Sequence, residues 1–168
     1  MRLPNALLTC LAVCAAFTLE AGAVARDGQW QCVTFARAHS GVEIRGNAHT
    51  WWDQAHGRYV RSSRPDVGAV LVMKSFGNGG MRLGHVATVS RVVSDREVLI
   101  THANWQGDGR VEENVRAVDV SPEGDWSRVR VWYAPVGDLG RTAYPAYGFI
   151  LPAPADAGVV DTADIAAP

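Results

Sequence analysis

The chain has 168 residues, of which 48% are hydrophobic and 20% are charged, a composition typical of one globular domain with enough chain to bury a core. Its formal net charge is −1, and basic residues only slightly outnumber acidic ones between residues 26 and 150. This balance argues against a nucleic-acid-binding protein, because binding a phosphate backbone requires a concentrated positive surface.

The first 25 residues have the pattern of a secretory signal peptide. Arg2 supplies a positive start, residues 7–19 contain no charge, and small residues at 21–25 offer a cleavage site. The apolar run is too short to span a membrane, so we expect an exported protein without membrane association after cleavage, periplasmic or alternatively secreted. A lipoprotein signal ending at Cys14 is the competing interpretation, which the bulky Val13 disfavours.

Signal cleavage would leave Cys32 as the only cysteine of the chain. Structural cysteines of exported proteins usually occur in pairs, so an unpaired one requires another explanation. It is buried and inert, it links to another chain, or it is kept for its reactivity.

The residues around Cys32 predict a helix over residues 32–39 that ends at Gly41. Phe35, Ala36 and His39 follow Cys32 at helical spacing. A thiol at the start of a helix lies near free backbone N–H groups and the positive end of the helix dipole, which favour the thiolate. Cys32 is therefore a candidate nucleophile, and a small buried core residue is the alternative interpretation.

The rest of the chain predicts one more helix and then strands. The helix begins after an Asn47 cap and ends at Gly57, and a hairpin-type connection is expected at residues 77–80. The predicted strands lie at residues 67–73, 83–93, 97–104 and 129–133. This order predicts an α+β fold for residues 26–150, with the N-terminal helices packed on an antiparallel sheet. Residues 151–168, acidic and rich in Ala and Pro, are predicted to be a disordered tail.

Among the five histidines, His85 is the candidate base. It follows Gly84 directly and enters an apolar strand pattern, whereas three of the others lie on or beside the predicted helices. A histidine held on a rigid strand opposite a cysteine at a helix start can take the thiol proton.

Two residues are candidates for orienting His85. His102 and Asn104 share one face of the next predicted strand by its two-residue period. Asn104 can accept the N–H of His85 and set its tautomer, and His102 can do the same or lie behind it. Two other interpretations are that Asn104 ends a strand in a turn, and that His85 and His102 bind a metal. No nearby cysteine or carboxylate completes a metal site at a recognisable spacing.

Five short motifs, taken in order, resemble the CHAP family, the cysteine, histidine-dependent amidohydrolases/peptidases of bacterial cell-wall metabolism. They lie within residues 28–106 and are Gln31-Cys32, Gly46-Asn47-Ala48, Pro65-Asp66-Val67-Gly68-Ala69-Val70, Gly84-His85-Val86-Ala87 and His102-Ala103-Asn104-Trp105. The resemblance implies a papain-like fold, without a metal or other cofactor in the chemistry. It implies cleavage of peptidoglycan as an N-acetylmuramoyl-L-alanine amidase or as an endopeptidase.

Carried over to this chain, the resemblance makes Cys32 the nucleophile, His85 the base and Asn104 the residue that orients it. Many members have a glutamate where this chain has His102, so whether Asn104 or His102 orients His85 stays open.

The resemblance also makes Gln31 or Gln29, with the backbone N–H of Cys32, candidate donors of an oxyanion hole. Trp105 is expected at the rim of the substrate groove. We expect an exported cysteine hydrolase whose partner is peptidoglycan; the alternative is a weakly active or inactive wall-binding or scaffold domain of the same fold.

Overall fold

The computed structural model describes residues 29–77 and 80–153. Within these residues two α-helices and three 3₁₀ helices accompany eight strands. The helices are α1 (Cys32–Ser40), η1 (Ala48–Thr50), α2 (Trp51–Gln54), η2 (Gly80–Leu83) and η3 (Ala134–Val136). The strands are β1 (Val60–Ser62), β2 (Val70–Met73), β3 (His85–Ser94), β4 (Glu97–Ala103), β5 (Val111–Asp119), β6 (Arg128–Tyr133), β7 (Asp138–Leu139) and β8 (Tyr144–Leu151).

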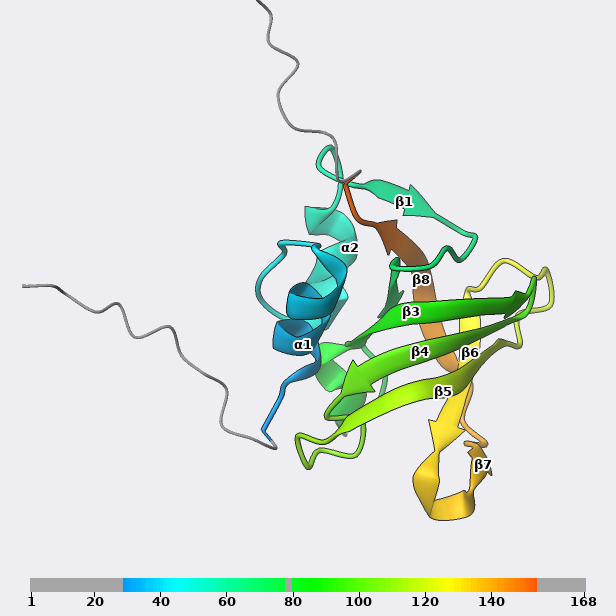
Figure 1. The fold of residues 1–168 in the computed structure, drawn as a ribbon. Helices are drawn as coiled ribbons and strands as arrows, with labels where there is room; N and C mark the ends of the chain where they lie inside the picture. The colour runs from blue at the N-terminus through cyan, green and yellow to red at the C-terminus, as the bar shows by residue number, and fades with distance from the viewer. Residues whose placement is uncertain (1–28, 78–79, 154–168) are drawn as a thin grey trace, which may run out of the picture.

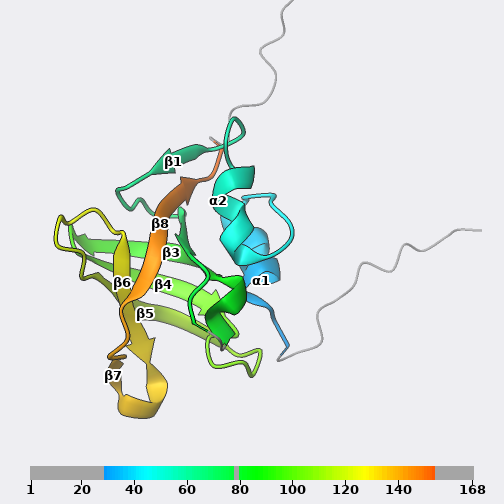
Figure 2. The same ribbon diagram turned by 180° about the vertical axis from the view of Figure 1, so that it is seen from behind.

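The strands form one antiparallel sheet in the order β1-β8-β2-β3-β4-β5-β6-β7. Strand β8 pairs with β2 and also with β6, so β8, β2, β3, β4, β5 and β6 close into a ring. The helices α1 and α2 lie together at one side of this sheet, beside the start of β3 and the end of β4 (Figure 1). From behind, β8 runs from β6 towards β1 (Figure 2). The predicted α+β class with an antiparallel sheet is confirmed.

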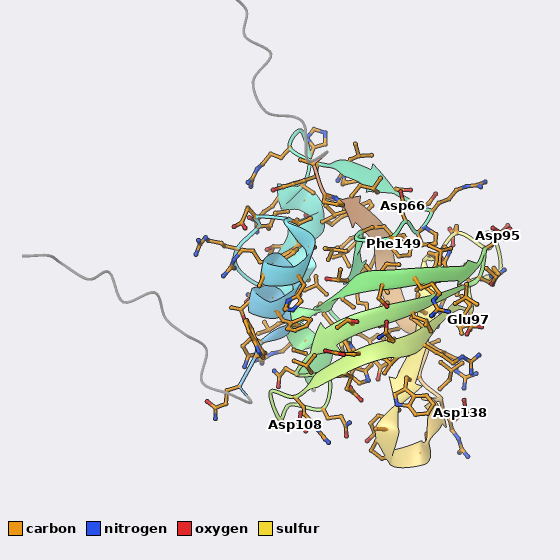
Figure 3. All side chains as sticks on the ribbon, in the orientation of Figure 1. Asp66, Asp95, Glu97, Asp108, Asp138 and Phe149 are labelled. Atoms are coloured by element: carbon orange, nitrogen blue, oxygen red, sulfur yellow. The ribbon has the colours of Figure 1, made fainter. Side chains whose placement is uncertain are left out.

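Strand β2 lies between two apolar clusters. Leu71 and Met73 pack with Phe149 in the cluster that fills the ring, whereas Val70 and Val72 pack with Trp51 against the helices. Alternate residues of a strand point to opposite faces, so a strand buried on both faces is apolar throughout. Figure 3 shows Phe149 near the centre of the molecule, whereas Asp95, Asp108 and Asp138 lie towards its edges. The two clusters fix the helices against the sheet.

The first predicted helix is confirmed, and the second is shorter than predicted. Helix α1 ends at Ser40, and Gly41 has a left-handed φ of 71°. The second begins as the 3₁₀ helix η1 and its α-helical part ends at Gln54. Asn47 precedes it in an extended conformation, but its side chain makes no capping hydrogen bond.

The β-structure is more extensive than predicted. Strand β2 begins at Val70 because residues 66–69 form a turn, closed by the Ala69 N–H on the carbonyl of Asp66. The connection from β2 to β3 contains η2, so it is not a tight hairpin. Strands β1, β5, β7 and β8 were not predicted.

The predicted signal peptide, residues 1–25, lies outside the described residues, as does all of the predicted tail beyond residue 153. No helix within residues 29–77 or 80–153 is long and apolar enough to cross a membrane.

Candidate active site

Helix α1 places Cys32 at its first residue. The Gln31 N–H donates to Thr34 Oγ1 at 3.3 Å, and the Thr34 hydroxyl donates to the Gln31 carbonyl at 3.0 Å, which closes the first turn. The helix packs on β3 and β4, and the half-buried Cys32 packs against the cluster beneath the helices. Cys32 is therefore held at the junction of α1 with the sheet.

The surroundings of Cys32 favour the neutral thiol. Burial raises the pKa of the Cys32 thiol, and the nearby backbone N–H groups of Val86, Val33 and Cys32 itself lower it by less. The helix start was expected to favour the thiolate, but here the cost of removing the charge from water is the larger effect. The thiol therefore needs a base to remove its proton at neutral pH.

Strand β3 places His85 beside the thiol. Cys32 and His85 line the same pocket, of about 280 Å³. His85 is only 4% exposed and follows Gly84, whose φ is 72°. A Cβ at Gly84 would lie 2.6 Å from the Met73 carbonyl oxygen and 2.8 Å from the His49 nitrogen. The glycine thus lets β2 and η1 approach the start of β3 closely.

His102 of β4 lies against His85. Nε2 of His85 is 3.0 Å from Nδ1 of His102, with the two rings perpendicular. His102 is only 1% exposed. Burial, and then the proximity of a second imidazole, hold the pKa of His85 well below its ordinary value of 6.5. The resting pair of Cys32 and His85 is therefore a neutral thiol beside a neutral imidazole.

Beyond His102 lies Glu112 of β5, which the sequence did not indicate. Nε2 of His102 is 3.5 Å from Oε2 of Glu112. This is an ion-pair distance, but the contact is not aligned as a hydrogen bond. Glu112 was missed because β5 was not predicted.

Asn104 makes its side-chain hydrogen bonds away from His85. Its Nδ2 donates to Gln31 Oε1 at 2.8 Å, and its Oδ1 accepts the N–H of Gly109 at 2.8 Å. Asn104 also has a left-handed φ of 60° in a turn after β4, as the turn interpretation expected. The structure thus places His102, rather than Asn104, against His85.

These bonds fix the orientation of the Gln31 amide. A backbone N–H only donates, so the group of Asn104 that faces Gly109 is its oxygen, and its NH₂ faces Gln31. The oxygen of Gln31 is therefore occupied and its NH₂ is left to donate. Gln31 and Asn104 line the pocket of Cys32 and His85. Gln29, the other predicted donor, is exposed at the start of the described chain.

Trp105 covers the two histidines. Its ring centroid lies 4.8 Å from that of His85 and 5.5 Å from that of His102. Trp105 lines a second pocket with His85, of about 350 Å³, and a larger one of about 800 Å³ that includes Arg130. Tyr133 and Tyr144 line both pockets and were not predicted as groove residues. The cavities form a surface that leads from His85 past Trp105.

Two of the remaining histidines have structural contacts. His39 stacks on Phe35 at 3.8 Å between ring centroids, and the Nδ1 of His49 lies 3.0 Å from the Leu83 carbonyl. Within the described part of the chain, no three His, Cys, Asp or Glu side chains gather as metal ligands would.

Comparison with known proteins finds a solved structure and a family model that this chain resembles. One solved structure that the chain resembles is an N-acetylmuramoyl-L-alanine amidase from Staphylococcus aureus, with 25% identity and a TM-score of 0.43. The similarity covers 69% of this chain but only 30% of that protein. A search of curated proteins found no match. A family model, the CHAP domain, matches residues 23–104, which include Cys32, His85 and Asn104. The predicted resemblance to the CHAP family is therefore confirmed over residues 23–104.

Proposed function

We propose that this protein is a cysteine hydrolase that cleaves an amide bond of bacterial peptidoglycan, as an N-acetylmuramoyl-L-alanine amidase or as an endopeptidase. The observation that carries the proposal is that Cys32 at the start of α1 and His85 at the start of β3 line one pocket inside the segment matched by the CHAP domain. A nucleophile on a helix beside a base on an antiparallel sheet is the papain-like arrangement.

The reaction begins from the neutral pair. His85 has its Nε2 engaged with His102, so its Nδ1 remains to accept the Cys32 proton. As the proton moves, Sγ attacks the amide carbon and the carbonyl oxygen becomes an oxyanion. The Gln31 NH₂ and the Cys32 backbone N–H at the helix start are the donors for this oxygen.

Collapse of the tetrahedral intermediate completes the first half. The His85 imidazolium returns the proton to the leaving nitrogen, the C–N bond breaks, and the acyl group stays on Cys32 as a thioester. His85, neutral again, takes a proton from water, and the hydroxide attacks the thioester carbon. The C–S bond then breaks, the acid is released, and the proton on His85 returns to the Cys32 sulfur.

Substrate binding must complete the alignment, because the contacts in the described residues include no hydrogen bond between the Cys32 thiol and the His85 ring. Catalytic hydrogen bonds are often loose without substrate and tighten in the complex. Val86, the residue after His85, provides a backbone N–H to the thiol, which holds Cys32 next to the start of β3.

Digestion of purified sacculi tests the proposal. The wild type is compared with Cys32→Ala and with His56→Ala, a change at an exposed histidine outside the pocket, under reducing conditions. Soluble fragments, identified by mass spectrometry, are expected from the wild type and His56→Ala only. Freed stem peptides would indicate an amidase and opened cross-links an endopeptidase. Equal release from Cys32→Ala would overturn the proposal.

A wall-binding or scaffold domain without activity is the second candidate. The observation that favours it is the pair of opposed pKa shifts, since burial disfavours both the Cys32 thiolate and the His85 imidazolium. Co-sedimentation with sacculi, without release of fragments by the wild type, would establish this alternative.

We further propose that the protein is exported through residues 1–25 and acts in the periplasm, with secretion as the alternative. The support is the sequence pattern alone. Mass spectrometry of the mature N-terminus tests it, and a lipid on Cys14 or an intact N-terminus would overturn it.

A further inference from the structure

A different side chain lies next to each ring nitrogen of His102. Nδ1 is 3.0 Å from Nε2 of His85, and Nε2 is 3.5 Å from Oε2 of Glu112. The His102 side chain is fully buried and that of Glu112 is 14% exposed. Within the described residues, Nε2 of His102 has no aligned hydrogen-bond partner, so Glu112 is the group it faces.

We propose that Glu112 is a positioning residue that acts on His85 through His102, so that Cys32, His85, His102 and Glu112 form one proton relay. The catalytic role rests on the proposed function; the contacts of His102 with His85 and Glu112 do not. In this relay the Glu112 carboxylate does not contact the base, His85, directly, because the ring of His102 lies between them.

The protons of the relay follow from one requirement. For His85 to accept the thiol proton at Nδ1, its own proton must be on Nε2, which then donates to Nδ1 of His102. His102 must therefore carry its proton on Nε2, which faces Glu112. A carboxylate accepts and never donates when ionised, so it selects this tautomer of His102.

The charge of Glu112 complements the transition state. When His85 takes the proton it becomes a buried cation, and a neutral His102 alone offers no negative charge to balance it. Among the described residues, the charged or titratable groups facing the two histidines are Cys32 from α1 and Glu112 from β5, and two tyrosines, Tyr133 of β6 and Tyr144 of β8, line the adjacent pocket. Glu112 is the carboxylate among them.

A bulge in β5 brings Glu112, rather than Glu113, opposite His102. The β4–β5 register pairs Ile100 with Val115 and then His102 with Glu112, so β5 has one extra residue between these pairs. Asn114, at this irregularity, has a left-handed φ of 53°. Without the extra residue, position 113 would face His102. Bulges often aim a side chain at an active site, and this one does so here.

The first test compares Glu112→Gln with Glu113→Gln, a matched change at the exposed neighbour. We expect Glu112→Gln to lower kcat about 10- to 100-fold with little change in KM, the usual range for losing a partner that orients a functional histidine. The acidic limb of the pH profile should move to lower pH, because a His85 cation without the carboxylate is less stable. Glu113→Gln should leave both unchanged. An unchanged kcat and acidic limb in Glu112→Gln would overturn the relay.

The second test does not depend on turnover. Nitrogen NMR of the histidine-labelled Cys32→Ala protein reports which ring nitrogen carries each proton. We expect His85 and His102 both protonated on Nε2 at neutral pH. A proton on Nδ1 of His102 would overturn the relay even in an active enzyme. The NMR experiment could give the expected tautomers while the wild type releases nothing from sacculi. That result would support the relay and overturn the proposed function.

Discussion

Asn104 and Gln31 are joined by a hydrogen bond of 2.8 Å that ties the end of β4 to the start of α1. The bond spans 73 positions of sequence and holds the residue before the nucleophile. It connects the element that carries Cys32 to the strand that carries His102.

We predict that Asn104→Ala lowers kcat about 10- to 100-fold by releasing the Gln31 amide from its donating orientation, somewhat less than the loss of a whole oxyanion donor. Gln31→Ala removes the donor itself and should lower kcat more, and the double variant should be no worse than Gln31→Ala alone, because Asn104 acts only through Gln31. Initial rates on soluble muropeptides measure this, with Gln29→Ala as the exposed control. Additive losses would show that the two residues act separately.

The Cys32 thiol should react slowly at neutral pH. Burial raises its pKa above 9.0, so the thiolate fraction grows only as the pH passes that value. Alkylation by iodoacetamide can be followed by mass spectrometry. Its rate should reach half of its maximum above pH 9.0 in the folded protein and at a lower pH in denaturant. A folded protein that alkylates fully at neutral pH would mean that the thiol is already ionised.

Acid should destabilise the folded protein through His85. The pKa of His85 is lowered on folding, so the unfolded chain binds the proton more tightly and stability rises with pH. This contribution is complete above pH 6.5 and is lost as the pH falls from 6.5 towards the folded pKa.

Urea unfolding at several pH values measures this effect. The free energy of unfolding should depend less steeply on pH in His85→Gln than in the wild type, whereas exposed His56→Gln should keep the wild-type slope. Equal slopes in all three proteins would contradict it.

Gly84→Ala should destabilise the protein far more than Gly57→Ala. Both glycines have φ near 70°, but a Cβ at Gly57 meets nothing within 4 Å, whereas at Gly84 it meets backbone atoms of Met73 and His49. We expect a loss of about 1 kcal/mol at Gly57 and more than about 2 kcal/mol at Gly84. Chemical denaturation gives both values, and equal losses would show that the close approach at Gly84 relaxes without cost.

Local sequence signals were enough to predict that Cys32 begins a helix and that His85 lies at the start of a strand. Cys32 begins a helix with regular apolar spacing and a glycine stop, and His85 begins a strongly apolar strand. Spacing and turn chemistry are local properties, and these elements follow them.

The strands that the sequence did not predict, among them β5 and β8, depend on pairing between segments that are distant in sequence. Strand β5 contains Glu112, Glu113 and Arg116, which weaken its apolar alternation, and β8 contains Pro145 and Gly148, which argue against a strand. Their partners in the sheet stabilise them nonetheless. The contact of His102 with Glu112 depends on the bulge in the pairing of β4 with β5. The sequence of either strand alone therefore does not predict this contact.

The closure of the ring by β8 also governs how the protein assembles. The segment that matches the CHAP domain ends at residue 104, before β5, β6 and β8, and Phe149 of β8 fills the ring beside Leu71. A fragment cut at residue 104 would expose the edges of β2 and β4 and lack Glu112. Because the first and last strands of the ring must meet, we expect folding to be slow and to wait for synthesis of Leu151. Cys32 therefore leaves the ribosome before the strands β5, β6 and β8 that complete its supporting framework.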